Sequence, residues 1–156
     1  MDLVIRDASE ADYGSWRVMW DQYLVFYEAT VSDGHAEWLW ERFLDQDNPL
    51  ECFVARSDNA VVGMVQFFAH PDTWGDRPMC YLQDLFVDPD HRGDGIGAML
   101  VGAVAERAVE RGWSSVYWQT GEDNVRARRL YDHLTGGPNG FIVYELGKPE
   151  QAKPWQ

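Results

Sequence analysis

The chain has 156 residues, of which 46% are hydrophobic and 25% charged, so it is long enough to enclose a core and has the composition of one globular domain. Its 26 acidic residues outnumber its 13 Lys and Arg residues, which gives a formal net charge of -13. This sign argues against nucleic acid as a partner and suits a cationic ligand.

The cysteines and the amino-terminal segment indicate the cellular compartment in which the protein is expected. Cys52 and Cys80 make neither a disulfide framework nor the spacing of a metal site, and both lie in apolar runs, so we expect buried thiols and no bound metal. Residues 1–7 lack a basic segment followed by an apolar stretch, and no apolar run reaches the roughly 18 residues of a membrane span. We therefore expect a cytoplasmic protein that does not enter a membrane.

The first third of the chain predicts a short strand and two helices. The strand is expected over residues 2–6, and Ser9 with Asp12 approximates a capping box at the start of a helix. Aromatic residues at spacings of three and four then mark a helix face that packs in the core. They are Tyr13, Trp16, Trp20, Tyr23 and Tyr27. The last turn of this helix, residues 23–28, could instead line a substrate pocket. A second helix is expected around residues 38–45.

The rest of the chain alternates between strands and helices. The expected strands are 51–57, 60–69, 79–87, 114–120 and 141–146, and the expected helices are 95–111 and one that opens at Asp123 or Asn124. The first two of these strands form a hairpin, and the unit over 79–120 implies a parallel crossover. The fold class is α/β (α+β): one domain over residues 1–146, a mixed, mostly antiparallel twisted sheet of roughly six or seven strands with about four helices on its faces, and a tail over 147–156.

A glycine-rich loop is the most informative stretch. Residues 92–97 read Arg-Gly-Asp-Gly-Ile-Gly, follow the strand stop Asp88-Pro89 and open a helix. Glycine lets backbone N–H groups approach a ligand, and the first N–H groups of a helix lie at its positive end, so the loop predicts a phosphate-bearing ligand. The loop also matches a dinucleotide fingerprint, but that fold starts with this unit and repeats it, unlike this chain. A turn without a ligand is the remaining alternative.

Two motifs together resemble a known family. The segment Arg92-Gly-Asp-Gly-Ile-Gly97 resembles the R/Q-x-x-G-x-G/A loop of the GNAT superfamily of acyl-CoA-dependent N-acetyltransferases. The segment Asn124-Val-Arg-Ala-Arg-Arg-Leu-Tyr131 resembles its N-x-x-A-x-x-L-Y helix. Around Tyr81–Pro89 the chain is most similar to the histone- and polyamine-acetyltransferase-like branch and to the diamine acetyltransferases. The resemblance implies acetyl-CoA as cosubstrate, and a homodimer to which the last strand and the tail would contribute.

The resemblance also implies which residues bind acetyl-CoA. The strand end would pair its backbone with the pantetheine arm, the glycine loop would hold the pyrophosphate, and the start of the second motif would flank the cofactor. These residues are Leu85, Phe86 and Val87; Arg92, Gly93, Asp94, Gly95, Ile96, Gly97 and Ala98; and Asn124, Ala127 and Arg128. For Asn124, a helix N-cap is an equal alternative.

The resemblance assigns Tyr131 as the general acid that protonates the thiolate leaving group. The base is open, because relatives often carry Glu-Asp where this chain has Gln83-Asp84, and an amide cannot take up the proton. Asp84 remains a candidate, as a base through water or as an anchor for a cation, although on a regular strand Gln83 and Asp84 point to opposite faces. Water alone could carry the proton. Further candidates are Glu28, His70 and Glu122.

The acceptor site is expected to combine aromatic faces and polar groups, which suit an amine. Its candidate residues are Tyr27, Glu28, Trp38, Trp74 and Gln83, although ordinary packing explains each aromatic residue equally well. We therefore expect direct transfer of an acetyl group from acetyl-CoA to a primary amine, either a small polyamine or diamine or an amino-acid-like amine. The alternatives are a protein lysine as acceptor and a non-catalytic acyl-CoA sensor.

Overall fold

A computed structural model describes residues 2–151 of the chain. The chain divides after Gly121 into two compact units, which are treated one at a time below. That residues 1–146 form a single domain stays a prediction. Within the described residues, no helix is both long and apolar enough to cross a membrane.

The first unit is built on one five-stranded sheet in the order β1-β2-β3-β4-β5. The strands are β1 (Leu3–Asp7), β2 (Glu51–Ser57), β3 (Ala60–His70), β4 (Met79–Val87) and β5 (Ser115–Tyr117). The first four pair antiparallel and β4 pairs with β5 in parallel, which confirms the predicted hairpin and crossover. The class is the predicted α/β fold, but the sheet has fewer strands than the six or seven expected.

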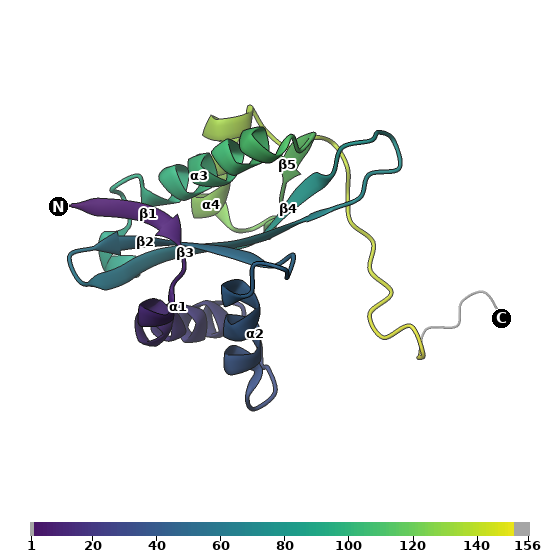
Figure 1. Cartoon of the computed structure of the whole chain (residues 1–156). Helices are drawn as coiled ribbons and strands as arrows, with labels where there is room; N and C mark the ends of the chain where they lie inside the picture. Colours follow the sequence, from purple (N-terminus) through teal and green to yellow (C-terminus); the bar gives the residue numbers. More distant parts are fainter. Residues whose placement is uncertain (1, 152–156) are drawn as a thin grey trace. The chain divides into compact units, whose positions relative to one another are not determined.

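Helices cover both faces of this sheet. On one face lie α1 (Tyr13–Phe26), which follows a 3-10 turn over Glu10–Asp12, and α2 (His35–Leu44), while α3 (Ile96–Arg111) lies on the other (Figure 1). Two hydrophobic clusters fill the space between the layers. The cluster beneath α1 and α2 includes Trp16, Trp20, Trp40 and Met64, and the cluster beneath α3 includes Phe67, Leu82, Leu100 and Val104. The start of the aromatic stripe of α1 is therefore core.

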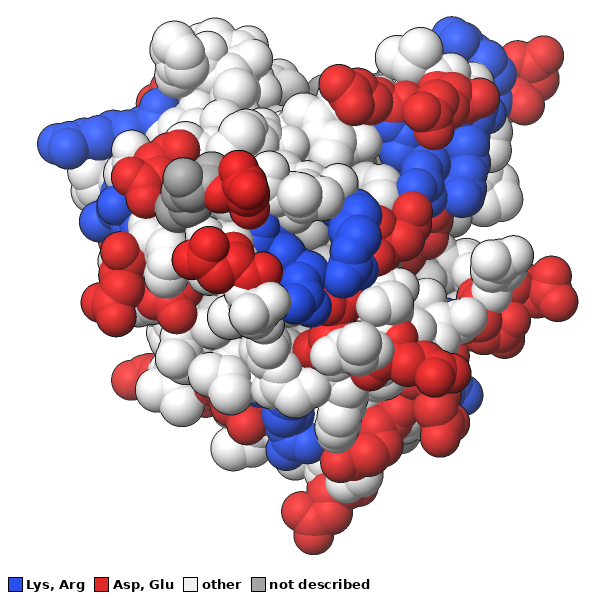
Figure 2. All heavy atoms as spheres, turned by 60° about the vertical axis from the view of Figure 1, so that its left-hand side comes forward, with Lys and Arg blue, Asp and Glu red and all other residues white. Residues whose placement is uncertain are grey.

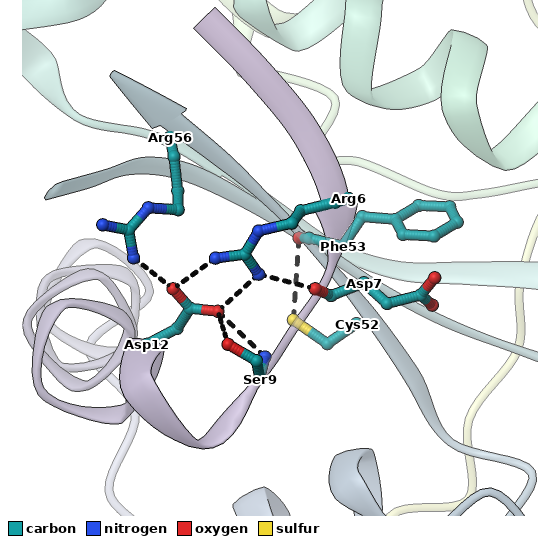
Figure 3. Close-up of polar contacts among 7 residues, drawn as sticks. All are labelled: Arg6, Asp7, Ser9, Asp12, Cys52, Phe53 and Arg56. Atoms are coloured by element: carbon teal, nitrogen blue, oxygen red, sulfur yellow. Dashed lines mark hydrogen bonds and ion pairs between the residues drawn. The ribbon is translucent and has the colours of Figure 1, made fainter. Parts of the chain in front are cut away.

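A buried carboxylate joins the start of α1 to the sheet (Figure 3). Asp12 is fully buried and accepts hydrogen bonds from Arg6 at 2.7 and 3.0 Å, from Arg56, and from the backbone and hydroxyl of Ser9 at 2.8 and 2.9 Å. Burial alone would raise the pKa of Asp12, but the bonds from Arg6, Ser9 and Arg56 hold it well below its usual range. The predicted capping box is present and forms part of a larger ionic anchor.

The second unit contains α4 (Val125–Thr135), and the strand predicted over 141–146 is wrong. Phe141, Ile142, Val143 and Tyr144 favour strands, but a strand also needs a neighbour for its backbone groups, and within the described residues this segment has no strand partner. The strand predicted over 114–120 is likewise shorter, since its pairing with β4 ends at Tyr117. Of the predicted tail, residues 152–156 lie outside the described residues.

Candidate active site

A β-bulge interrupts β4 at the predicted catalytic strand. In the pairing of β3 with β4, Gln66 lies opposite Asp84 and Phe67 opposite Leu82, so Gln83 faces no partner. One extra residue on one strand is a bulge, and bulges re-aim side chains, often beside active sites. The Gln83 side chain is exposed, and the regular alternation expected for Gln83 and Asp84 does not hold here.

The bulge changes which side chains of β4 face which helix layer. Before it, Cys80 and Leu82 pack in the cluster beneath α3; after it, Leu85 and Val87 pack there. The step from Leu82 to Leu85 is odd, whereas a regular strand keeps even steps on one face. Asp84 is thereby turned to the face of α1 and α2, away from the cluster that holds Leu82.

Asp84 ends a chain of hydrogen bonds that crosses three elements. The Trp16 Nε1–H group on α1 donates to Gln66 Oε1 on β3 at 2.9 Å, and Gln66 Nε2 donates to Asp84 Oδ2 on β4 at 2.8 Å. Tyr23 on α1 also hydrogen-bonds to the carboxylate. Burial raises the pKa of Asp84 above its usual range, although the bonds from Tyr23 and Gln66 oppose the shift. A half-buried carboxyl group with a raised pKa is suited to proton transfer.

The second half of β4 has a strand neighbour on one side. The pairing of β5 with β4 covers Met79 to Tyr81 and goes no further among the described residues of the first unit. Leu85 to Val87 therefore pair with β3 only. A strand edge left open in this way can add an extended ligand through its backbone groups, as the prediction for the pantetheine arm requires.

Left-handed glycines shape the loop between β4 and α3. Gly93 has a φ of 101° and Gly95, the N-cap of α3, has a φ of 78°, a region that L side chains rarely adopt. A Cβ atom added at either position would meet no atom within 4 Å outside the adjacent residues, so the space beside the backbone is open and the positive φ alone disfavours a side chain. The side chain of Ile96 is buried and anchors the first turn of α3 beneath this loop.

Arg92 places positive charge beside these glycines. Its Nε donates to the carbonyl oxygen of Val87 at 3.0 Å, and its guanidinium lies 5.4 Å from the ring centroid of Phe86. The first amides of α3, at Ile96, Gly97 and Ala98, lie at the positive end of the same helix. Acidic side chains outnumber basic ones on the face drawn in Figure 2. Against this surplus, the open loop with the first amides of α3 and one arginine fits a pyrophosphate.

The second unit organises the other predicted motif along α4. Asn124 caps the helix, since its Oδ1 accepts from the amide of Ala127 at 3.3 Å. Arg128 donates to the carbonyl oxygen of Glu122 at 2.8 Å, so its guanidinium braces the turn before the helix. Tyr131 lies on the same helix. The contacts predicted between these residues and acetyl-CoA stay predictions.

The predicted acceptor residues fall into two groups. Tyr27 is the C-cap of α1, and its ring centroid lies 4.8 Å from that of Tyr23, which lies 6.2 Å from that of Phe86. This row of rings runs from α1 to β4 beside Asp84. Glu28 follows Tyr27 with a φ of 52°, an uncommon conformation for a non-glycine residue.

The other two aromatic candidates lie on other elements. Trp38 on α2 already has a cation over its ring, because the guanidinium of Arg42 lies 3.7 Å from the ring centroid. Trp74 lies in the loop between β3 and β4 and is 92% exposed. An amine-binding role for either ring stays a prediction.

His70, a further candidate base, is engaged at the end of β3. Its Nδ1 lies 2.7 Å from the carbonyl oxygen of Pro71, which can only accept, so Nδ1 carries a proton. Its Nε2 lies 2.7 Å from the hydroxyl of Tyr117. His70 is thus tied to β5 and its own loop, whereas Asp84 lies on the α1 face of β4.

Sequence reasoning missed Gln66. The only signal was a polar residue inside the apolar run of β3, and its partners Trp16 and Asp84 are 50 and 18 positions away in the chain. Tyr23 was assigned to the aromatic stripe, whose last turn was expected to line either the core or a pocket; the structure adds its bond to Asp84.

Comparison with known proteins agrees with this geometry. Residues 13–136 match the Acetyltransferase (GNAT) family. The chain belongs to the GNAT acetyltransferase family. It is an N-acetyltransferase, and its cosubstrate is acetyl-CoA.

Two curated relatives and one solved structure illustrate the similarity of this GNAT chain. It is 28% identical to the D-amino-acid N-acetyltransferase of Saccharomyces cerevisiae, over 83% of this chain and 81% of that protein. It is 30% identical to the thialysine N-epsilon-acetyltransferase of Bos taurus, over 85% of this chain and 82% of that protein. The ribosomal-protein-alanine N-acetyltransferase of Brucella melitensis shares the fold, with a TM-score of 0.79 and 24% identity over 93% of this chain and 99% of that one.

Proposed function

We propose that this GNAT enzyme acetylates the primary amine of a small molecule, either an amino-acid-like amine or a diamine or polyamine. The observation that carries the proposal is Asp84, a half-buried carboxyl group turned by the bulge toward α1 and hydrogen-bonded to Tyr23, whose ring centroid lies 4.8 Å from that of Tyr27 and 6.2 Å from that of Phe86. A carboxylate beside aromatic faces suits an ammonium group. The names of two relatives refer to D-amino acids and to thialysine, which are small amines.

The proposed reaction is direct attack of the amine on the thioester carbonyl. A C–N bond forms, the C–S bond breaks, the amine gives up one proton, and the sulfur of the leaving thiolate takes one. Asp84 accepts the first proton, directly or through one water, and the hydroxyl of Tyr131 supplies the second.

The cysteines favour direct transfer over an acyl-enzyme. Burial raises the pKa of Cys52, and it raises the pKa of Cys80 to about 12, so neither thiol is a ready nucleophile. Two buried free thiols also fit a reducing compartment, and we place the enzyme in the cytoplasm.

Acetyl-CoA is proposed to lie along the second half of β4 and across the start of α3. The backbone of Leu85–Val87 would pair with the pantetheine arm, while the loop 92–98 would hold the pyrophosphate between Arg92 and the first amides of α3. Asn124, Ala127 and Arg128 are proposed to flank the cofactor from α4.

The acceptor is proposed to enter beside Tyr27, Glu28 and Gln83. Gln83 is exposed at the bulge, so its amide could orient a polar group of the acceptor without taking up the proton. Trp38 and Trp74 would contribute at the rim, Trp38 with its face shared with Arg42.

We further propose a homodimer to which the exposed segment over 141–146 contributes. The segment combines strand-forming residues with high exposure; Phe141 is 81% and Tyr144 89% exposed. An unpaired run of this kind is a template for association with another chain. Sedimentation at micromolar concentrations should give twice the chain mass of 18.0 kDa, and a monomer would contradict the proposal.

Release of free thiol from acetyl-CoA tests the proposed function. The full chain would be assayed with a D-amino acid, thialysine, a diamine, a polyamine and a lysine-containing peptide. Turnover on one or more of the small amines is expected. Turnover confined to the peptide would move the acceptor to a protein lysine, and no turnover on any amine would overturn the proposal.

A further inference from the structure

We infer that Gln66 is a positioning residue for acetyl transfer: held by Trp16, it fixes the carboxylate of Asp84 in the orientation that receives the proton of the acceptor amine. This inference rests on the proposed role of Asp84 as proton acceptor. Gln66 lies on β3, outside the two motifs that resemble the family.

The orientation of the Gln66 amide follows from its partners. An indole N–H can only donate, so the Gln66 atom that lies 2.9 Å from Trp16 Nε1 must be the carbonyl oxygen. The NH₂ group therefore faces Asp84 Oδ2, at 2.8 Å. Trp16 is fully buried and Gln66 is 3% exposed, so no water replaces a lost bond easily. A flipped amide would set two donors against each other.

This fixed donor acts on one protonation state of Asp84. An NH₂ group cannot accept, so the carboxyl oxygen it faces must accept, and the ionised form of Asp84 offers both oxygens as acceptors. The hydrogen bond from Gln66 therefore favours the ionised form of Asp84, which is the form that can take up a proton. It also holds the carboxyl plane, because Gln66 and Asp84 lie directly opposite each other beside the bulge.

The remaining groups around Asp84 bring no positive charge. Tyr23 faces it from α1, and the pKa values of Cys52 on β2 and Tyr81 on β4 are raised first by burial and then by the nearby charge of Asp84. Among residues 2–151 no Arg, Lys or His forms an ion pair with Asp84. Neutral dipoles alone balance the carboxylate, so a bound ammonium group would be its first counter-charge.

Two substitutions at Gln66 test the role of its hydrogen-bond donor separately from the role of its side-chain shape. Gln66→Glu keeps an oxygen for Trp16 and nearly the same volume, but it replaces the permanent NH₂ donor that faces Asp84 with a carboxyl oxygen that donates only while it carries a proton. Two carboxyl groups about 3 Å apart share a proton, so the upper apparent pKa of the pair, which the Asp84 carboxyl carbon reports, should rise by at least about one unit. Gln66→Leu removes the donor without adding charge, which raises that pKa by about one unit. Gln22→Glu, on the exposed face of α1, is the matched control.

Two readouts on the full chain test the inference. One is the titration of the Asp84 carboxyl carbon by ¹³C NMR, assigned with Asp84→Asn. The other is the acid limb of kcat/KM against pH, with acetyl-CoA and thialysine, or the best amine of the panel. Both midpoints should move to higher pH by at least about one unit in Gln66→Glu and by about one unit in Gln66→Leu, and by less than about 0.3 unit in the control.

The outcomes separate the positioning role of Gln66 from the proposed role of Asp84 as proton acceptor. If the NMR midpoint is unchanged in both Gln66 variants, the positioning role is overturned, whatever the rates show. If the NMR midpoint moves while the acid limb of kcat/KM stays, Gln66 does set the carboxyl group but Asp84 is not the proton acceptor, and the proposed role of Asp84 is overturned. Movement of both midpoints supports the inference.

Discussion

Asp12→Asn should cost the first unit a large part of its stability. The substitution keeps the size of the side chain but removes the charge shared by Arg6 and Arg56, and it turns one acceptor oxygen into a donor (Figure 3). Breaking a buried ion pair from one side costs about 3–5 kcal/mol. The side chains of Arg6 and Arg56 are 37% and 22% exposed and can regain water, so we expect the lower end, about 3 kcal/mol.

The loss is measurable by urea unfolding at pH 7, monitored by Trp fluorescence. A native chain has about 5–15 kcal/mol of stability, so about 3 kcal/mol is a large fraction of it. Asp33→Asn, at an exposed position, is the matched control and should change the unfolding free energy by less than about 0.5 kcal/mol.

The pH dependence of the stability difference tests whether the charge of Asp12 is the cause of the loss. The pKa of Asp12 is lowered in the folded state, so its contribution is fully present above the unfolded value of about 3.9 and is lost as the pH falls below it. The difference in stability between the wild type and Asp12→Asn should therefore narrow between about pH 5 and pH 2. A loss under about 1 kcal/mol at pH 7, or a difference that stays constant down to pH 2, would show that the charge of Asp12 does not stabilise the first unit in this way.

Three further predictions concern the transferase site. Tyr131→Phe should lower kcat by about 100-fold and leave the Kd for acetyl-CoA within about twofold, measured by steady-state kinetics and calorimetry; an unchanged kcat would contradict the acid role. Arg92→Ala should weaken acetyl-CoA binding by about tenfold, because it removes charge beside the glycine loop, and equal affinity in the variant would argue against a pyrophosphate there. Gly95→Ala places a Cβ atom at a φ of 78° and should cost about 1–2 kcal/mol of stability in urea, whereas no loss would mean that the loop readily adopts another conformation.

The glycine loop could be predicted from the sequence because its signals are local. The strand stop, Arg92, the glycines and the first residues of α3 are consecutive, and the backbone at Gly93 and Gly95 has the left-handed form that glycine favours. The cap at Asn124 is local in the same sense. Such features depend on neighbours a few positions away.

The environment of Asp84 could not be predicted in this way. The bulge at Gln83 exists only relative to the pairing of β3 with β4, and register is a property of two strands. The bond from Gln66 depends on that register and on the packing of α1 against β3. The strand predicted over 141–146 failed for the opposite reason: its residues favour a strand, but propensity supplies no partner.

The decisive measurement on the role of Asp84 is the pH dependence of kcat/KM for the wild type and for Asp84→Asn, with acetyl-CoA and one active small amine. We expect an acid limb in the wild type whose midpoint lies above the ordinary Asp value of about 3.9, and we expect its loss in Asp84→Asn together with a fall of about 100-fold in the plateau rate. A variant that keeps both the limb and the rate would contradict the claim that the carboxyl group at the β4 bulge accepts the proton of the amine.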